Sequence, residues 1–256
     1  MLVTTFIPDD NRIGVFTSAP AWYDGMWSPI VGCTAVSPGC ASCVSATYAA
    51  ADSGTGRAMD GLGERMADGR GRWTGSVRLA PIDEPSDGRG QALFVVPMSD
   101  LFHEDVPDAY RKKMFDLMEI YPQHTYLVLT KRTKAAYNWF RQYQAPASMW
   151  LGVSVEDQQR ADERISDLLH SRVKHRWLNC EPLLGPIEIE NQMIERLDWI
   201  AAGAEFGPQA RSANAEWFDS LREQCTAAKV PFYLKGMLDG QEHRDRPWID
   251  AAGLKR

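Results

Sequence analysis

Six short apolar runs, separated by segments with helical spacing, constrain the fold of this chain more than any other sequence feature. The runs cover residues 93–97, 125–130, 150–155, 176–180, 197–202 and 230–234. They are continuous and rich in Val, Leu and aromatic residues, which is typical of strands buried on both faces of a parallel sheet. Between them, apolar residues recur at helical intervals, as at Tyr110, Met114 and Leu117. Strands that alternate with helices predict right-handed β-α-β units.

The number of these units predicts a complete or partial TIM-like (β/α) barrel with parallel strands. A further strand is expected near residues 26–31, before the six runs. The chain has 256 residues, of which 44% are hydrophobic, so one domain over residues 1–256 can bury a sizeable core. An open doubly wound sheet is the alternative architecture, and the apolar runs are compatible with both.

Residues 54–90 interrupt the alternation of predicted strands and helices, and they hold nine of the 20 glycines. A long Gly-rich connection in a compact domain is usually disordered or a functional lid. We therefore expect a flexible insertion after the first helix. Short hairpins are the alternative, because residues 72–79 have a strand-like sequence.

Charge and cysteine content exclude several classes of protein. The formal net charge of −6 excludes a chain coated in basic charge, so contact with nucleic acid requires a local patch. No apolar run approaches the roughly 20 residues of a membrane span, and the first residues lack the pattern of a secretory signal. An odd number of cysteines, five, argues against a disulfide scaffold. We expect a cytoplasmic protein without membrane contact.

Three of the cysteines, Cys33, Cys40 and Cys43, follow a C-x6-C-x2-C spacing in a loop rich in Gly and Pro. Three neighbouring thiolates suit a soft metal centre. A structural zinc would need a fourth ligand, from His103, Cys180 or a carboxylate. A [4Fe–4S] cluster held by three cysteines would leave one iron open to a small molecule. The spacing leaves both alternatives open, whereas Cys180 and Cys225 are expected to pack in the core.

Polar side chains follow the predicted strands where each strand ends. In parallel β/α proteins these ends share one edge, where the chemistry is usually found. The cysteine loop follows the first predicted strand and opens at the same edge, which favours a cluster that faces a ring of carboxylates and amines. The strand-end residues are Ser99, Asp100, His103, Lys131, Arg132, Ser154, Glu156, Glu181, Glu205 and Lys235.

Several ordered blocks resemble a family of phage-encoded three-cysteine-motif proteins that are similar to radical SAM enzymes. The blocks are WSPIVGCTAVSPGCASC, VPMSDLFHEDVPD, YPQHTYLVLTKR, WLGVSVEDQQRADERI, CEPLLGPI and VPFYLK. The resemblance implies a partial barrel of the radical SAM type and a [4Fe–4S] cluster on Cys33, Cys40 and Cys43. It also implies S-adenosylmethionine as cofactor and an external electron donor. The chain departs from the family at Ser28, at Val44 and within residues 203–211.

The resemblance also implies roles for the strand-end residues. Ser99 and Asp100 would accept the methionyl amine, and Lys131 or Arg132 would pair with the carboxylate. Glu156 and Ser154 would accept the ribose hydroxyls. Glu181, Glu205 and Lys235 are left for the substrate, with His103 as a proton donor.

Structural roles compete with these functions. Asp100 can cap a short turn, and Lys131 with Arg132 can form a solvated helix start. Glu156 can favour the dipole of a helix expected over residues 156–170, and His103 can be a structural histidine.

We expect a radical SAM enzyme that modifies a nucleobase or nucleotide in phage DNA hypermodification. The expected partners are that small-molecule or nucleotide substrate, or DNA, and a second phage-encoded protein, all in the host cell cytoplasm. The alternative is a non-catalytic binding or partner protein that is stabilised by zinc or by a cluster.

Overall fold

Seven parallel strands form one sheet whose spatial order follows the order along the chain. The computed structural model describes residues 22–85, 88–205, 210–235 and 246–247. The strand order is β1-β6-β7-β8-β9-β10-β11, and all neighbouring pairs are parallel. The strands are β1 (Gly25–Trp27), β6 (Ala92–Val95), β7 (Thr125–Thr130), β8 (Met149–Ser154), β9 (His175–Cys180), β10 (Trp199–Gly203) and β11 (Phe232–Lys235).

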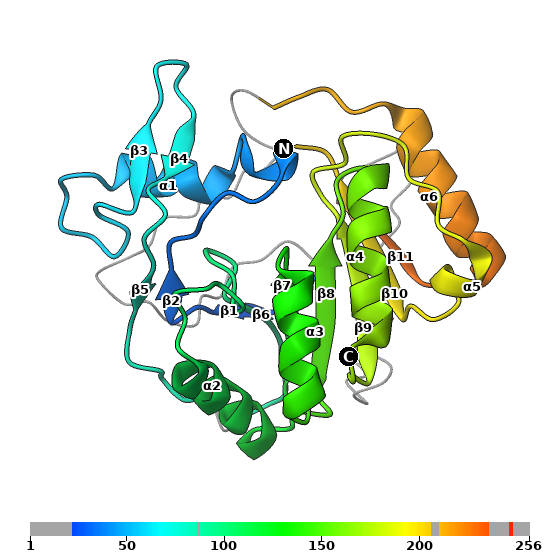
Figure 1. Cartoon of the computed structure of the whole chain (residues 1–256), viewed down its shortest axis with the longest axis horizontal. Coiled ribbons are helices and arrows are strands. Elements are labelled where there is room, and N and C mark those ends of the chain that lie inside the picture. Colours follow the sequence, from blue (N-terminus) through cyan, green and yellow to red (C-terminus); the bar gives the residue numbers. More distant parts are fainter. Residues whose placement is uncertain (1–21, 86–87, 206–209, 236–245, 248–256) are drawn as a thin grey trace.

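The sheet curls into a half-barrel, with β1 and β11 at its two edges (Figure 1). A doubly wound sheet would reverse its strand order at a switch point, and the described strands show no such reversal. The predicted parallel α/β architecture is therefore confirmed, and the curled sheet agrees with a partial barrel.

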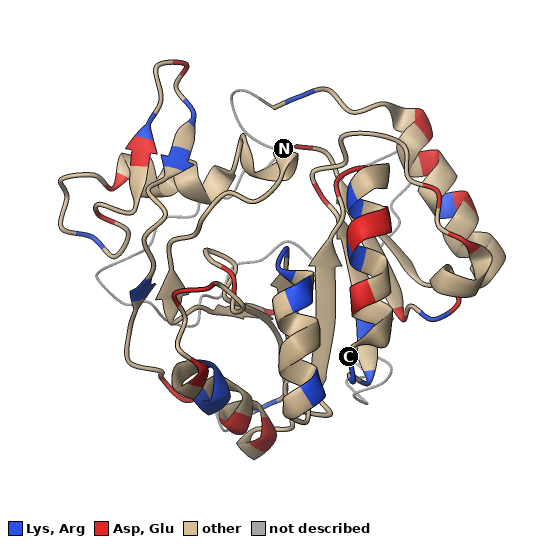
Figure 2. Ribbon diagram, viewed as in Figure 1, with Lys and Arg blue, Asp and Glu red and all other residues tan. Residues whose placement is uncertain are grey.

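Helices connect the strands and cover the outer face of the sheet (Figure 1). They are α2 (Asp108–Ile120), α3 (Thr133–Gln142), α4 (Gln158–His170), α5 (Asn191–Ile194) and α6 (Ala215–Ala228). A further helix, α1 (Val44–Ala51), follows the cysteine loop, which itself contains the 3-10 turn η1 (Pro38–Cys40). Acidic and basic residues are interspersed over the helices (Figure 2), in line with the absence of a basic coat expected from the sequence.

Strand alternation divides the core into two layers, because successive side chains point to opposite faces. The outer layer packs against the helices and includes Val128, Leu151 and Leu178. The inner, concave layer contains the aromatic residues Trp150, Trp177 and Trp199, together with Trp22 and Tyr233. Toward the ends of β8, β9 and β11, the inner positions are polar, at Ser154, Asn179 and Lys235.

The expected strand over residues 26–31 is wrong as a single element. The structure has two short strands there, β1 in the main sheet and β2 (Ile30–Val31), which pairs antiparallel with β5 (Arg78–Leu79). Pro29 lies between them and has no N–H to donate to a ladder. The chain therefore leaves the parallel sheet at this point and turns toward the cysteine loop.

Residues 54–90 contain a hairpin of β3 (Gly63–Arg65) and β4 (Gly71–Trp73), followed by β5. The alternative of short hairpins is confirmed for these strands. The hairpin packs on α1, and a small apolar cluster that includes Ala49, Leu62 and Trp73 joins the two. The insertion thus lies beside the helix that follows the three cysteines.

The helix expected over residues 156–170 begins two residues later than predicted. Asp157 is its N-cap, and its Oδ1 accepts a hydrogen bond from the N–H of Arg160 at 2.9 Å. Glu156 therefore lies before the helix, in the segment that leaves β8. Among the described residues, no helix is long and apolar enough to span a membrane.

Gly152 gives a direct test of the inner layer. An ideal Cβ at this position would lie 2.2 Å from the Trp177 ring, whose indole N–H donates to the Trp150 carbonyl at 3.2 Å. We predict that Gly152→Ala lowers the free energy of unfolding by about 1–3 kcal/mol, because it overpacks this layer. Urea denaturation measures the change. Gly185→Ala is the matched control, since its Cβ would lie 3.7 Å from Asp157 Cβ; equal losses in both variants would contradict the packing described.

Candidate functional site

The cysteine loop, residues 33–43, brings three thiols to the C-terminal edge of the sheet. Cys33, Cys40 and Cys43 are free and half-buried. All three line a cavity of about 130 Å³. The remaining wall comes largely from the ends of β6, β7 and β8, and it includes Phe94, Ser99, Asp100, Leu129, Thr130, Lys131, Arg132 and Ser154. The predicted convergence of cysteines and strand ends is therefore present for this part of the edge.

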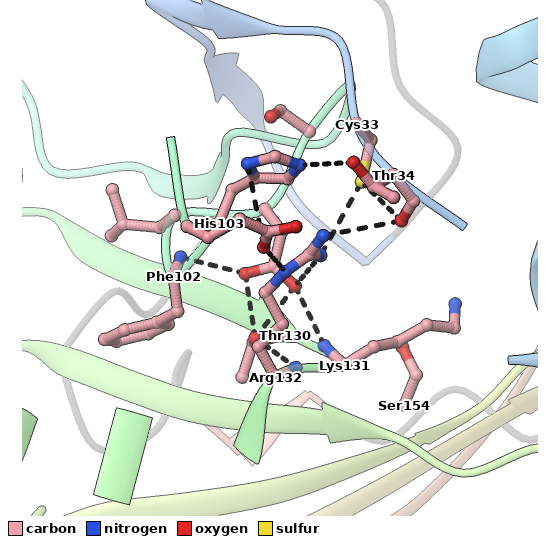
Figure 3. Close-up of polar contacts among 12 residues, drawn as sticks. Cys33, Thr34, Phe102, His103, Thr130, Lys131, Arg132 and Ser154 are labelled. Carbon is pink, nitrogen blue, oxygen red and sulfur yellow. Dashed lines mark hydrogen bonds and ion pairs between the residues drawn. The ribbon is translucent and has the colours of Figure 1, made fainter. Parts of the chain in front are cut away.

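Arg132 connects the first cysteine to the sheet (Figure 3). Its guanidinium donates to Cys33 Sγ at 3.8 Å and to the Thr34 carbonyl at 3.4 Å, and it forms an ion pair with Glu104 at 2.8 Å. Burial and the Asp100 carboxylate raise the pKa of Cys33 to about 11, although Arg132 opposes them. The thiol is therefore protonated at neutral pH, and a metal centre that binds there must displace its proton.

Asp100 organises the ends of β6 and β7 through four protein donors. Its carboxylate accepts from Phe102 N at 2.9 Å, Thr130 Oγ1 at 2.8 Å, Lys131 N at 3.1 Å and Arg132 at 3.3 Å (Figure 3). A carboxylate offers about four lone-pair sites. The side chain thus closes the turn after β6, which is the structural alternative for Asp100, and it also fixes Arg132. The neighbouring Ser99 donates its hydroxyl to the Gly32 carbonyl and so ties the same turn to the cysteine loop.

Glu156 lies beneath the cysteine loop and is fully buried. It accepts hydrogen bonds from Ser37 Oγ at 2.5 Å and from Arg164 at 3.0 Å, and Lys131 Nζ is 3.6 Å away. An ideal Cβ at Gly39 would lie 2.5 Å from Glu156 Oε1, so the loop backbone rests directly on this carboxylate. Glu156 therefore joins the loop to β8 and α4.

Lys131 lines the cavity with the cysteines and interacts electrostatically with two of them, Cys40 and Cys43. Burial lowers its pKa, but Cys40, Glu156 and Cys43 outweigh burial and hold it above the ordinary value. The side chain is thus charged at neutral pH. A positive charge in this position stabilises thiolates.

His103 is buried and neutral beside the cysteine loop. Its Nδ1 accepts from Asp105 N at 3.1 Å, so Nε2 carries the proton and donates to Thr34 Oγ1 at 2.8 Å (Figure 3). Burial and Arg132 lower its pKa, in agreement with the neutral form. These contacts fit the structural alternative for His103.

Glu205 approaches the loop from β10. Arg211 forms an ion pair with Glu205 and donates to the Pro38 carbonyl at 3.0 Å. Burial raises the pKa of Glu205, but Arg211 and a hydrogen bond from Ser42 outweigh burial and keep it below its usual range. Glu205 thus helps to hold the far side of the cysteine loop.

Glu181 and Lys235 lie apart from the cysteine cavity. They form an ion pair across the inner face, and Lys235 Nζ lies 4.2 Å from the centroid of the Trp22 ring. Burial and Glu181 raise the pKa of Tyr23. Neither Glu181 nor Lys235 lines the cavity around the three thiols.

Three further residues, Ser37, Arg164 and Arg211, belong to this site and were not expected there from the sequence. Arg164 carried a usable signal, because a charged residue there falls within the apolar stripe of α4 between Ala161 and Leu168. A buried arginine needs a carboxylate partner, and Glu156 is that partner. Ser37 and Arg211 carried no comparable signal.

The geometry defines a class of protein: a parallel α/β half-barrel with a three-cysteine loop at its C-terminal edge. In the described part of the chain, no three His, Cys, Asp or Glu side chains are grouped as ligands of one metal ion. The chain belongs to the family described as "Protein of unknown function (DUF5131)", which matches residues 17–247. Comparisons with curated proteins and with solved structures gave no match.

The role of Glu156 as the support of the loop is testable by a nearly isosteric change. We predict that Glu156→Gln lowers the free energy of unfolding by about 3 kcal/mol, because it leaves the buried Arg164 without its ion-pair partner. Urea denaturation measures the loss. Glu163→Gln is the control, since that side chain is 49% exposed and its ion pair contributes below about 1 kcal/mol. Similar stabilities of the two variants would contradict the role assigned to Glu156.

Proposed function

We propose that this chain is a radical SAM enzyme. Cys33, Cys40 and Cys43 would hold a [4Fe–4S] cluster, S-adenosylmethionine would bind beside it, and a nucleobase or nucleotide would be the substrate. The observation that carries this proposal is that three free thiols line one cavity, together with two cationic side chains, where the parallel strands end.

The donor set fits a three-ligand cluster better than a closed zinc site. A structural zinc takes four protein ligands, and the fourth was expected from His103, Cys180 or a carboxylate. His103 directs both ring nitrogens to other partners, and Cys180 is fully buried in the outer layer of the core. Asp100 lines the cavity, but four protein donors already occupy its carboxylate.

A cluster also separates its cysteine ligands more widely than one metal ion does, because each thiolate binds a different iron. Three thiols from one loop line the same cavity, and three is the number of cysteine ligands that such a cluster would use here. A cluster held by these three cysteines would keep one iron without a protein ligand, and that iron could bind a small molecule.

Cys33, Cys40 and Cys43 would hold the cluster, which, once reduced by an external electron donor, would supply the one electron needed to cleave S-adenosylmethionine to methionine and a 5′-deoxyadenosyl radical; that radical would take a hydrogen atom from the substrate. The protein's own contribution is binding and charge. Lys131 and Arg132 would pair with the cofactor carboxylate, and Ser154 would contact a hydroxyl. Ser99 and Asp100 would contribute to the amine site only after exchanging a contact that each makes within the protein.

The substrate class rests on the resemblance to phage-encoded proteins and on the charge of the chain. A net charge of −6 disfavours unspecific binding to nucleic acid. A single nucleotide or nucleobase, or DNA delivered by a partner protein, fits this charge better than an extended duplex.

The formation of 5′-deoxyadenosine tests the reaction. Protein purified without oxygen is mixed with S-adenosylmethionine and dithionite, and the products are separated by liquid chromatography. We predict 5′-deoxyadenosine from the natural sequence and at least about a 100-fold loss in Cys33→Ala, Cys40→Ala and Cys43→Ala, because each removes one ligand.

Cys225→Ala is the matched control, since this cysteine is buried in α6 and should retain the activity. A cluster-bearing natural protein that forms no 5′-deoxyadenosine would rule out the proposed reaction.

Mass spectrometry of DNA nucleosides, with this gene intact or deleted in its own genome, then identifies the modified base. Identical nucleosides in both samples would argue against DNA as the final product.

A further inference from the structure

The insertion, residues 54–90, lies directly against the cysteine loop. Thr34 Oγ1 donates to the Gly75 carbonyl at 3.4 Å. Gly32 has a φ of 92°, and an ideal Cβ there would lie 2.2 Å from the Ser76 carbonyl oxygen, so glycine permits an approach of the two backbones that other residues would block. The start of the cysteine loop is thus held against the segment between β4 and β5.

The β3–β4 hairpin of the insertion packs just as closely on α1, the helix that follows the cysteine loop. An ideal Cβ at Gly63 would lie 2.5 Å from the Ala50 nitrogen. One at Gly71 would lie 2.3 Å from the Ala46 carbonyl oxygen, and the N–H of Gly71 donates to Thr47 Oγ1 at 3.2 Å. Because backbone meets backbone at both points, the hairpin is fixed beside α1 at the end of the loop (Figure 1).

Trp73, in β4, is the point at which the insertion reaches the cavity. It is 8% exposed and lines the cavity together with the three cysteines, and no other described residue of the insertion does so. Its neighbour Arg72 is exposed, because successive side chains of a strand point to opposite faces. Cys33 and Cys43 pack against the apolar cluster that contains Trp73 and Leu62. On the side of the insertion, the wall of the cavity is therefore an aromatic ring.

The cysteine loop has little apolar surface with which to cover its own thiols. Val36 lines the cavity but is 44% exposed, and the other non-cysteine residues of the loop are small, polar or proline. Apolar side chains around a metal site control the access of solvent to it, and the exposure of a cysteine helps to set its reactivity. Any apolar cover of the loop must therefore come from another part of the chain.

We infer that the insertion is a fixed cover of the cysteine site, in which the Trp73 ring excludes water and small reagents from Cys33, Cys43 and the group that they hold. A tryptophan buries about 150–250 Å² of surface, so its replacement by alanine leaves an opening in the cavity wall. For a bound cluster, this cover also limits solvent exposure, which is one determinant of the reduction potential. The inference rests on the proposed function only for the identity of the bound group.

The test compares Trp73→Ala with the natural sequence in the full-length protein, purified without oxygen. The chelator 4-(2-pyridylazo)resorcinol binds both iron and zinc, so the rate of metal loss is measurable with either bound group. The second measurement is the rate at which iodoacetamide alkylates each cysteine of the reduced, metal-free protein, followed by mass spectrometry of its peptides. We expect Trp73→Ala to accelerate metal loss, and the alkylation of Cys33 and Cys43, by about tenfold or more. Cys225, which is buried in α6, should be alkylated at an unchanged rate.

Leu62→Ala is the matched control, because Leu62 is 4% exposed and belongs to the same apolar cluster as Trp73 but does not line the cavity. It should lower the melting temperature and leave both rates close to those of the natural protein. Trp73→Phe retains a ring and should also keep both rates close to the natural ones. Natural rates in Trp73→Ala, or an equal acceleration in Leu62→Ala, would overturn the inference.

If Trp73→Ala fails to fold, Trp73→Leu replaces it, with the same expected acceleration and the same overturning results. Neither measurement involves S-adenosylmethionine or requires that the bound metal be iron. Failure of this inference is therefore distinguishable from failure of the proposed reaction.

Discussion

The buried carboxylate of Glu156 joins the cysteine loop to the sheet, and the arrangement of the candidate site depends on that junction. It accepts from Ser37 on the loop and from Arg164 on α4, and it lies close to the ammonium of Lys131. Gly39 lets the loop backbone reach it. Because a buried carboxylate needs partners on every side, the loop, two strand ends and a helix are held in one arrangement.

The same network sets the electrostatics of the cavity. Lys131 is charged beside Cys40 and Cys43, and Arg132 reaches Cys33. These two cations would offset most of the negative charge of three thiolates. Lys131 also lies near Glu156 and Arg132 also donates to the Thr34 carbonyl, so metal binding and the position of the loop depend on the same side chains. Glu205, with Arg211, holds the opposite side of the loop through Pro38 and Ser42.

Much of the fold was predictable from the sequence because the signals are local. The run over 125–130 coincides with β7, since every residue of a strand buried on both faces is apolar or small. Pro29 explains why residues 26–31 divide into two strands. This division was also predictable, because the proline is visible in the sequence. The convergence of cysteines with Lys131 and Arg132 followed from the shared edge of parallel strands. The role of Glu156 was not predictable, because its partners are 119 and 8 residues away along the chain and only the tertiary structure brings them together.

The proposed function depends most on the identity of the group that the three cysteines hold. Iron, zinc and acid-labile sulfide contents of protein purified without oxygen test this directly. We predict about four iron and four sulfide per chain, without stoichiometric zinc. About one zinc per chain, with neither iron nor sulfide, would contradict it.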